Sequence, residues 1–328
     1  ADSGVATNTA VFIGTNAFAV SKALDPFMRL AVLDTDSALS PLIYGYNAEN
    51  ALASVSNEAF EVAYQFDGTR DAGCVITLTN GLTVTRALTR DPHRRYLVTA
   101  VSNAVGASAH SIIEYSHNIL GNVTNCNGDA FSYNPRSEVS GAVIGNELFN
   151  YSYDGIGNLV WSAENVLTNT YSANNLNQYT AVNAVTPQYD ADGNLTAIGQ
   201  LSLTWDAENR NTAVLSNGVP LVANSYDPQH RRVIKATPAA THIFLFDGWL
   251  PVLEKISRAD GTSKVREHVW GKDLSGTRGG AGGVGGLLAT RIGEAWYSPL
   301  YDNNGNVTDY IDESGAIVAH REYDAFGK

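Results

Sequence analysis

The amino-acid sequence predicts an all-β fold in which a repeated hairpin builds one large sheet. Three observations lead to this prediction. An aromatic residue followed by Asp recurs along the chain, Gly or Asn follows such Asp residues at the spacing of a tight turn, and the segments between them alternate apolar with polar residues. From Tyr115 to Phe246, successive aromatic markers are 16 to 21 residues apart. A period near 20 residues is typical of an array in which each unit pairs with its neighbours.

Each repeat unit is predicted to be a hairpin with a structural turn. Asp can accept a backbone N–H from two residues further on, and Gly or Asn tolerates positive φ. One unit then holds two strands of about 6 to 8 residues and two turns. The rings of successive units are expected to contact one another across the sheet. The predicted turn residues are Tyr153, Asp154, Gly157, Asn158, Tyr189, Asp190, Gly193, Asn194, Trp205, Asp206, Tyr226, Asp227, Tyr301, Asp302, Gly305, Asn306, Tyr323 and Asp324.

The repeat changes in character along the chain. Residues 1–43 are rich in Ala, Thr and Ser, and we expect them to form entry strands with weak repeat character. The repeat is predicted for residues 44–328 and is cleanest over residues 115–246. A long gap between the late markers predicts an insertion, which contains the glycine-rich loop 276–286.

Two segments bear on the assignment of strands. Asn80-Gly81 lies between two alternating arms and is the clearest hairpin signal of the chain. Residues 47–60 carry apolar residues near helical spacing, but the start of this segment also fits the turn motif. We therefore predict a strand there rather than a helix.

The composition limits the classes of function. Hydrophobic residues make up 44% of the 328 residues and charged residues 16%, which leaves enough apolar material for a core. The net charge is -12 and basic pairs such as Arg94-Arg95 are isolated, so no nucleic-acid partner is expected. No apolar stretch approaches the ~20 residues that cross a bilayer. Cys74 and Cys126 lack the spacing of a zinc site, and either a disulfide or two buried thiols would fit them.

Both ends of the sequence look interrupted. The sole methionine is Met28, so we expect an initiator, and a signal peptide if there is one, to lie upstream of Ala1. The last residues begin another turn unit at Tyr323 and Asp324 and stop at Lys328. We therefore expect the natural polypeptide to continue.

The repeated motifs, taken together, resemble those of the Rhs or YD-repeat family. The resemblance covers at least residues 115–328, and its expected extent is 44–328. It rests on the Tyr-Asp-x-x-Gly-Asn-Leu units, on Tyr226-Asp-Pro-Gln-His-Arg-Arg232, on the block Gly282-Gly-Val-Gly-Gly-Leu-Leu288, and on the units that follow at Tyr301 and Tyr323.

This resemblance implies a β-sheet ribbon that spirals into a hollow shell, as in bacterial Rhs toxins, the cocoon component of Tc toxins and animal teneurins. In the bacterial members the shell encloses a variable C-terminal toxin, and in teneurins it serves cell adhesion. The implied location is secreted or at the cell surface. Many bacterial members carry self-cleavage aspartates after the last repeats. The sequence stops before that segment, so no catalytic residue is carried over.

The turns that begin at Asp190 and Asp302 also resemble the start of a calcium loop. Both carry Gly in the fourth place, where a calcium loop needs it in the sixth. Only the second has an acidic residue, Glu313, in the twelfth place. A structural role is favoured for both turns, and calcium stays an alternative at the second.

Motifs for catalysis are weak or missing. Gly280-x-Gly282-x-x-Gly285 matches a dinucleotide fingerprint but lacks the surrounding strand and helix, so a flexible loop or close backbone packing is expected instead. The sequence contains neither a Gly-x-Ser-x-Gly elbow nor His-Glu-x-x-His. His268 lies on an aromatic segment, where a hydrogen-bonded structural histidine is favoured over a general base.

These observations predict a shell segment that encloses or scaffolds a linked C-terminal polypeptide and is not an enzyme. No cofactor or metal is assigned to it. Exposed sheet edges would allow copies to associate. The alternative is an extracellular adhesion or carbohydrate-binding module, because five Trp and sixteen Tyr could stack on sugars. A glycan-degrading enzyme is the least favoured, since no pair of carboxylates stands out.

Overall fold

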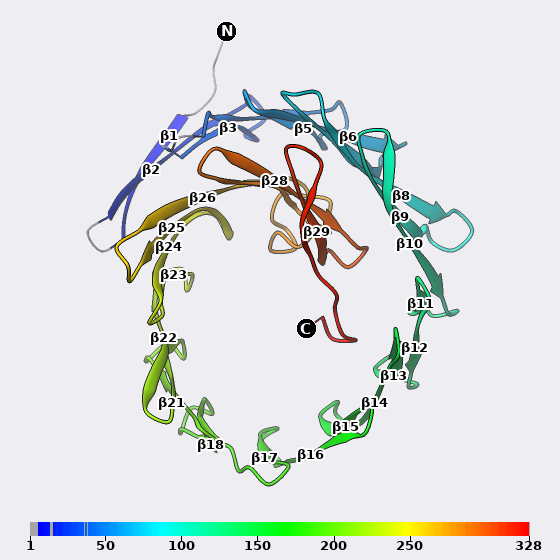
Figure 1. Ribbon diagram of the computed structural model, residues 1–328, viewed down its shortest axis with the longest axis vertical. Coiled ribbons are helices and arrows are strands. Elements are labelled where there is room, and N and C mark those ends of the chain that lie inside the picture. Colours follow the sequence, from blue (N-terminus) through cyan, green and yellow to red (C-terminus); the bar gives the residue numbers. More distant parts are fainter. Residues whose placement is uncertain (1–5, 14–15, 36, 38, 328) are drawn as a thin grey trace. The chain divides into compact units, whose positions relative to one another are not determined.

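The structure is a computed structural model that describes residues 6–13, 16–35, 37 and 39–327. Within these residues every regular element is a β-strand, which confirms the predicted all-β fold (Figure 1). The outermost part of the expected entry strands, residues 1–5, lies outside the described residues, as does Lys328. The described part of the chain contains no helix of the length and apolar character needed to cross a membrane.

The first sheet has 17 antiparallel strands, and each strand pairs with the next one along the chain. Consecutive pairing is what a series of hairpins produces. The strands are β1 (Ala6–Ile13), β2 (Asn16–Leu24), β3 (Leu30–Asp34), β4 (Leu42–Tyr46), β5 (Leu52–Ser56), β6 (Phe60–Asp67), β7 (Arg70–Leu78), β8 (Thr83–Asp91), β9 (Leu97–Val105), β10 (Ser108–His117), β11 (Val123–Cys126), β12 (Asp129–Tyr133), β13 (Val139–Ile144), β14 (Glu147–Tyr153), β15 (Leu159–Glu164), β16 (Leu167–Ala173) and β17 (Tyr179–Val182).

The second sheet has 13 strands and follows the same rule. Its strands are β18 (Gln188–Tyr189), β19 (Leu195–Ile198), β20 (Leu201–Trp205), β21 (Asn211–Ser216), β22 (Val219–Tyr226), β23 (Arg232–Ala236), β24 (Ala240–Asp247), β25 (Leu250–Arg258), β26 (Ser263–Trp270), β27 (Leu287–Ile292), β28 (Ala295–Tyr301), β29 (Val307–Asp312) and β30 (Ile317–His320).

The chain divides into two compact units, and the first contains the main hydrophobic core. Unit 1 comprises residues 1–113 and 242–322. Here the strands before β10 and the strands from β24 onward pack as two layers, with β26 and β28 against β3 to β6 (Figure 1). Val62 from one layer and Val269 from the other are fully buried. Each such side chain contributes about 1.5–3 kcal/mol by leaving water.

Unit 2 comprises residues 114–241 and 323–328 and buries much less apolar surface. Its buried hydrophobic residues, among those the structure describes, are Tyr115, Ala142 and Phe149. Large apolar side chains such as Val166 are exposed. With little core, this unit relies more on its ladder hydrogen bonds and on the contacts within and between its turns.

The two segments singled out from sequence have the expected structure. Asn80-Gly81 lies in the turn between β7 and β8, where the N–H of Gly81 donates to the carbonyl of Leu78 at 2.9 Å. The region 47–60 contains a turn followed by the strand β5 and no helix. The expected insertion is also present, because residues 271–286 connect β26 to β27 without forming a strand.

Candidate functional site

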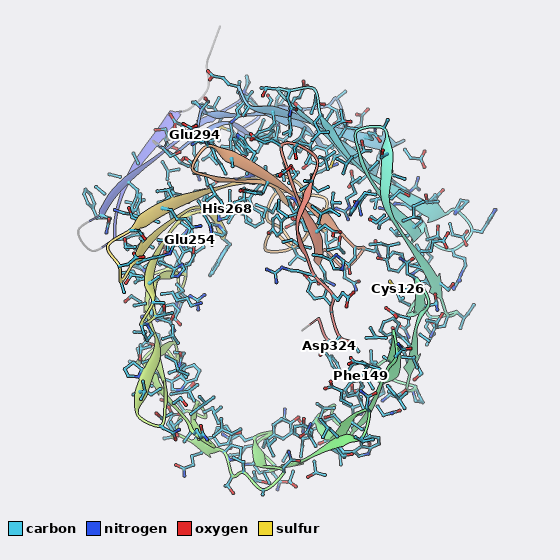
Figure 2. The ribbon with its side chains drawn as sticks, in the orientation of Figure 1. Cys126, Phe149, Glu254, His268, Glu294 and Asp324 are labelled. Atoms are coloured by element: carbon cyan, nitrogen blue, oxygen red, sulfur yellow. The ribbon has the colours of Figure 1, made fainter. Side chains whose placement is uncertain are left out.

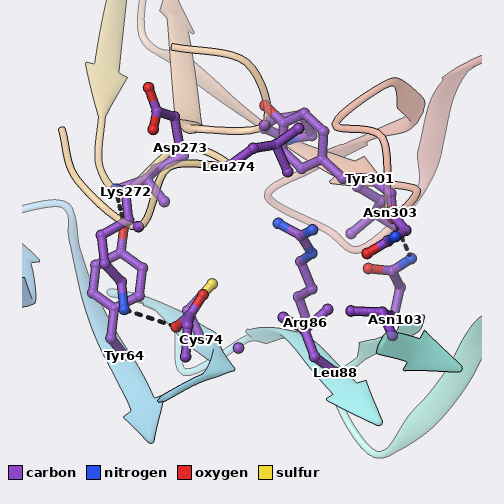
Figure 3. Close-up of a pocket in the computed structure, with 18 of the residues that line it drawn as sticks. Tyr64, Cys74, Arg86, Leu88, Asn103, Lys272, Asp273, Leu274, Tyr301 and Asn303 are labelled. Carbon is purple, nitrogen blue, oxygen red and sulfur yellow. Dashed lines mark hydrogen bonds and ion pairs between the residues drawn. The ribbon is translucent and has the colours of Figure 1, made fainter. Parts of the chain in front are cut away.

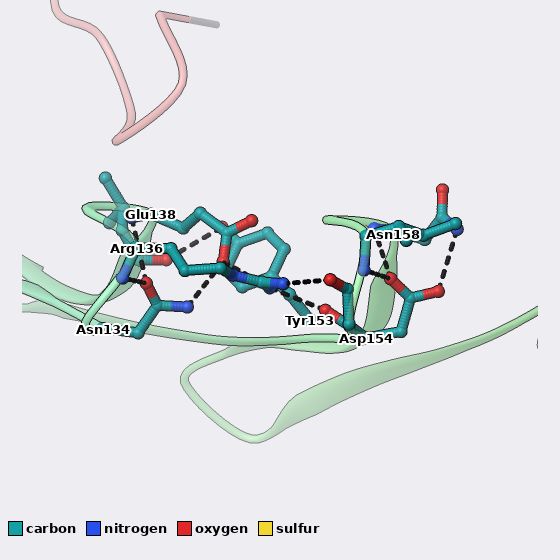
Figure 4. A network of polar contacts seen from close by, with 9 residues as sticks. Asn134, Arg136, Glu138, Tyr153, Asp154 and Asn158 are labelled. Carbon is teal, nitrogen blue, oxygen red and sulfur yellow. Dashed lines mark hydrogen bonds and ion pairs between the residues drawn. The ribbon is translucent and has the colours of Figure 1, made fainter.

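The turn between β14 and β15 illustrates the repeated feature of the chain (Figure 4). The N–H of Asp154 donates to the carbonyl of Asn158 at 2.9 Å and closes a loop over residues 154–158. The carboxylate of Asp154 accepts the N–H groups of Ile156 at 2.9 Å and Asn158 at 3.0 Å, and also the Asn158 side-chain amide at 2.9 Å. This side-chain bond is the main cause that lowers the pKa of Asp154. Gly157 fills the fourth place with a φ of 98°.

In eight of the described turns the first and fifth residues form a complementary hydrogen-bonding pair. Where the fifth residue donates, the first is Asp, as in Asp206, whose carboxylate accepts Nε of Arg210 at 2.8 Å. Where the fifth residue accepts, the first is Asn, as in Asn134, whose amide donates to Glu138 at 2.6 Å. The other pairs are Asp25–Arg29, Asp154–Asn158, Asn174–Gln178, Asp190–Asn194, Asp227–Arg231 and Asp302–Asn306.

The aromatic markers reach back to the preceding hairpin. The hydroxyl of Tyr153 donates to the carbonyl of Val139 at 2.8 Å, and the indole N–H of Trp205 donates to the carbonyl of Leu195 at 2.8 Å. Both acceptors are the first residue after the preceding turn. The strand register shifts beside both markers, and such a bulge re-aims a side chain. The same bond joins Tyr46 to Leu30, Tyr133 to Val123, Tyr189 to Tyr179, Tyr226 to Asn211 and Tyr301 to Leu287.

We expected the rings of successive markers to contact one another. Tyr171 is a marker with a ring contact, to Tyr179 of the next strand, with ring centroids 5.4 Å apart. The contact that recurs along the chain is instead the hydrogen bond from the ring to a carbonyl. Each such bond contributes about 1 kcal/mol net and fixes one hairpin to the one before it.

Side chains also link neighbouring turns of unit 2. The guanidinium of Arg136 donates to the carbonyls of Asp154 and Gly155, both at 2.6 Å (Figure 4). The side-chain amide of Asn158 donates to Asn177 of the following turn at 2.6 Å. The turns of this unit therefore form a connected row along one side of the sheet.

The structure places the predicted turn residues at one kind of position. Tyr153, Tyr189, Trp205, Tyr226 and Tyr301 each end a strand, and the Asp that follows each of them begins the loop. Tyr323 and Asp324 follow β30, and the carboxylate of Asp324 accepts the N–H of Phe326 at 2.9 Å. Further turns with this bonding, not singled out from the sequence, begin at Asp25, Asn118, Asn134, Asn174, Asp273 and Asp312.

Asp273 organises the glycine-rich insertion. Its carboxylate accepts the N–H of Ser275 at 2.9 Å within its own turn, and the N–H groups of Ala281 and Gly283 at 2.6 and 3.0 Å from the glycine run. A Cβ on Gly283 would lie 2.9 Å from the ring of Trp270. Of the two expectations for this run, close backbone packing is the one that the structure bears out.

Titratable side chains on β24 to β27 are bonded to one another. Glu254 accepts Nδ1 of His242 at 2.6 Å and Nη1 of Arg266 at 2.9 Å. Nδ1 of His268 lies 3.0 Å from Oγ1 of Thr290, so His268 is hydrogen-bonded as predicted, and burial lowers its pKa to about 4 (Figure 2). Across the described residues, no group of three or more His, Cys, Asp or Glu side chains could hold a metal ion.

The carboxylate proposed as the first ligand of a second-turn calcium site is engaged within the protein. The carboxylate of Asp302 accepts the N–H groups of Asn304 at 2.9 Å and Asn306 at 2.8 Å. The structural reading of this turn is therefore the better supported. Both cysteines are thiols rather than a disulfide.

The sequence of this chain is similar to those of several known proteins. No protein-family model matches the chain. The tRNA3(Ser)-specific nuclease WapA of Bacillus spizizenii is 32% identical over 186 residues, which cover 55% of this chain and 8% of the relative. The tRNA nuclease WapA of Bacillus subtilis strain 168 is 28% identical over 187 residues, covering 55% of this chain and 8% of the relative. The tRNA(Glu)-specific nuclease WapA of Bacillus subtilis subsp. natto is 28% identical over 159 residues, covering 48% and 6%.

Proposed function

We propose that this chain is a non-catalytic shell segment of the YD-repeat type, which encloses or scaffolds a toxin-like polypeptide linked to it on the C-terminal side. The observation that carries the proposal is the repeated turn, with its complementary first and fifth residues and its aromatic hydrogen bond. The side chains of these residues form hydrogen bonds within the turn and to the preceding hairpin, so they serve to hold the hairpins together. Such an array builds a wall, and its edges are covered by pairing with the next hairpin.

The relatives support a division of labour between a wall and a separate activity. Two of them are named for different tRNA substrates, yet each matches about half of this chain and only 6–8% of its own length. A shared wall joined to a variable nuclease would produce this pattern. We therefore propose that the linked polypeptide is a nuclease, and that the whole protein acts from outside the producing cell or from its surface.

The proposal is tested with the natural full-length polypeptide and with this chain alone. We expect the full-length protein, once unfolded and refolded or proteolytically opened, to cleave tRNA, and this chain to leave tRNA intact. We also expect the linked polypeptide to resist protease within the native protein. Replacing Asp190 and Asp206 together by Ala should open two neighbouring turns of unit 2 and expose it. Asp260→Ala, in an exposed hairpin turn of unit 1, is the control.

Three outcomes would contradict the proposal. Cleavage of tRNA by this chain alone would make it an enzyme. Equal protease sensitivity of the linked polypeptide in the native and the doubly substituted protein would remove its role as an enclosure. A specific, competable hit on a glycan array would favour the adhesion module instead.

A further inference from the structure

A cavity of about 420 Å³ lies between the two layers of unit 1 (Figure 3). This volume falls in the range of small-molecule sites, about 300–1,000 Å³. One wall is a row of directly paired residues on β6 to β9, namely Tyr64, Cys74, Arg86 and Asn103. Neighbouring strands are about 4.8 Å apart, so these side chains lie side by side. The facing wall is formed by the segment 272–274 and by β28.

The charged groups around this cavity do not balance. Lys272 is paired with Asp71, its Nζ lying 2.7 Å from the carboxylate. The carboxylate of Asp273 is occupied by the N–H groups of its turn and of the glycine run. Arg86 and Arg90 also line the cavity, and neither forms an ion pair with the residues that the structure describes. A positive surplus inside a chain of net charge -12 needs an explanation.

Arg86 is the central basic group. Its guanidinium projects into the cavity (Figure 3). Its Nη2 donates to the carbonyl of Asp302 over a long 3.4 Å, and its Nε is buried without a partner among the described residues. The guanidinium carbon also lies 5.6 Å from the ring centroid of Tyr301. A half-buried guanidinium with no ion pair is stabilised strongly by an anion, because two parallel N–H groups on one edge of the fork can donate to one carboxylate.

Asn103 supplies an acceptor next to that cation. The side chain is 1% exposed, and its Nδ2 donates to Oγ of Ser111 at 3.1 Å and to the carbonyl of Tyr301 at 3.3 Å. Because a carbonyl can only accept, the latter bond fixes which end of the amide faces Tyr301. The opposite end, Oδ1, is buried without a partner among the described residues and lies on the side of Arg86 (Figure 3). This oxygen therefore needs a hydrogen-bond donor, which a ligand in the cavity can supply.

We propose that this cavity binds a small oxyanion that carries a hydroxyl group, of the hydroxycarboxylate class. The guanidinium of Arg86 pairs with the carboxylate, and Oδ1 of Asn103 accepts a hydrogen bond from the hydroxyl. Arg90, on the same strand, adds positive potential further along the cavity. Leu274 is 49% exposed and stands at the edge, where a ligand can enter. The site does not depend on the proposed enclosure of a linked polypeptide, because all of its residues belong to unit 1.

A matched pair of ligands tests both contacts in the full chain. L-Malate and succinate carry the same charge, and only malate has the hydroxyl. By titration calorimetry we expect malate to bind at least about tenfold more tightly than succinate, since a site built to bond a hydroxyl rejects the analogue without it. Arg86→Gln should weaken malate at least about tenfold. Asn103→Ala should bring malate and succinate to similar affinities. Arg258→Gln, at an exposed turn of unit 1, is the control and should leave the affinities for malate and succinate unchanged.

A measurement on the unsubstituted protein guards against variants that fail to fold. The ¹⁵N resonance of Arg86 Nε should shift when malate is added and should move much less with succinate. Absence of both heat and shift at millimolar malate would overturn the proposal. So would binding that Arg86→Gln leaves unchanged, and equal affinity for the two ligands would refute the role of Asn103.

Discussion

Replacing Asp273 by Ala is expected to destabilise unit 1 and to release the glycine-rich loop. The carboxylate holds the loop from inside, because it accepts the N–H groups of Ala281 and Gly283 eight and ten residues further on. Gly283 is buried and packs against Leu250 and Trp270. Water therefore cannot replace the lost acceptor there without moving the loop out of its place.

The size of the effect follows from the donors that lose their acceptor. A buried N–H without a partner costs about 1–3 kcal/mol, and the N–H of Gly283 is in that position. The half-buried N–H of Ala281 and the loss of the charge-assisted bonds of Ser275 add a smaller amount. We expect a total loss of about 3 kcal/mol, a large part of the 5–15 kcal/mol that is typical of a folded protein.

Urea unfolding and hydrogen exchange together measure this loss. The urea midpoint should fall, and amide protection over residues 279–286 should disappear. Asp312→Ala is the matched control, because Asp312 forms the same kind of turn in the same unit without reaching a distant loop. If Asp273→Ala leaves the midpoint and the loop protection unchanged, or if Asp312→Ala lowers the midpoint as much, the reasoning is refuted.

Three further predictions concern other parts of the fold. Tyr301→Phe keeps the buried ring but removes its bond to the carbonyl of Leu287, so urea unfolding should show a loss of about 1 kcal/mol. Burial lowers the pKa of His268 to about 4, whereas in the unfolded chain this side chain takes up a proton near pH 6.5. The free energy of unfolding should therefore fall as the pH is lowered from 6.5 to 4. His268→Gln should reduce that fall. Asp206→Asn should lower the thermal midpoint, because its amide would face the guanidinium of Arg210. Adding Arg210→Glu should restore the midpoint, because it recreates the amide–carboxylate pair that Asn134 and Glu138 form. A double variant with a lower midpoint than the single variant would contradict this.

The strands and the marked turns could be predicted because their signals are local. An Asp with Gly three residues later satisfies its own turn, as Asp154 and Gly157 do, whatever the rest of the chain does. The turns at Asp25 and Asn134 were not among the predicted turn residues, although Tyr133 fits the repeat register, because Met28 and Ser137 hold the positive-φ place, with φ of 63° in both. Their signal is instead the donor or acceptor side chain four residues further on, Arg29 and Glu138.

The contacts between hairpins and between layers could not be predicted, since they depend on register and on distant segments. The partner of Trp205 is a carbonyl, that of Leu195, and which carbonyl it meets is fixed by a bulge. The cavity joins Arg86 to a segment about 190 residues later, so no local pattern reveals it. Glu267 likewise accepts the N–H of Leu39 from 228 residues away.

The pairing of first and fifth turn residues explains how such a wall can vary in sequence and keep its form. Asp206 with Arg210 and Asn134 with Glu138 have opposite polarities, yet both satisfy the second polar atom of the first side chain. Either pair leaves the loop and the aromatic bond to the preceding hairpin intact. A change at one position alone leaves two donors or two acceptors facing each other, which is unfavourable. In these turns a substitution at the first residue is therefore tolerated best together with a matching substitution at the fifth.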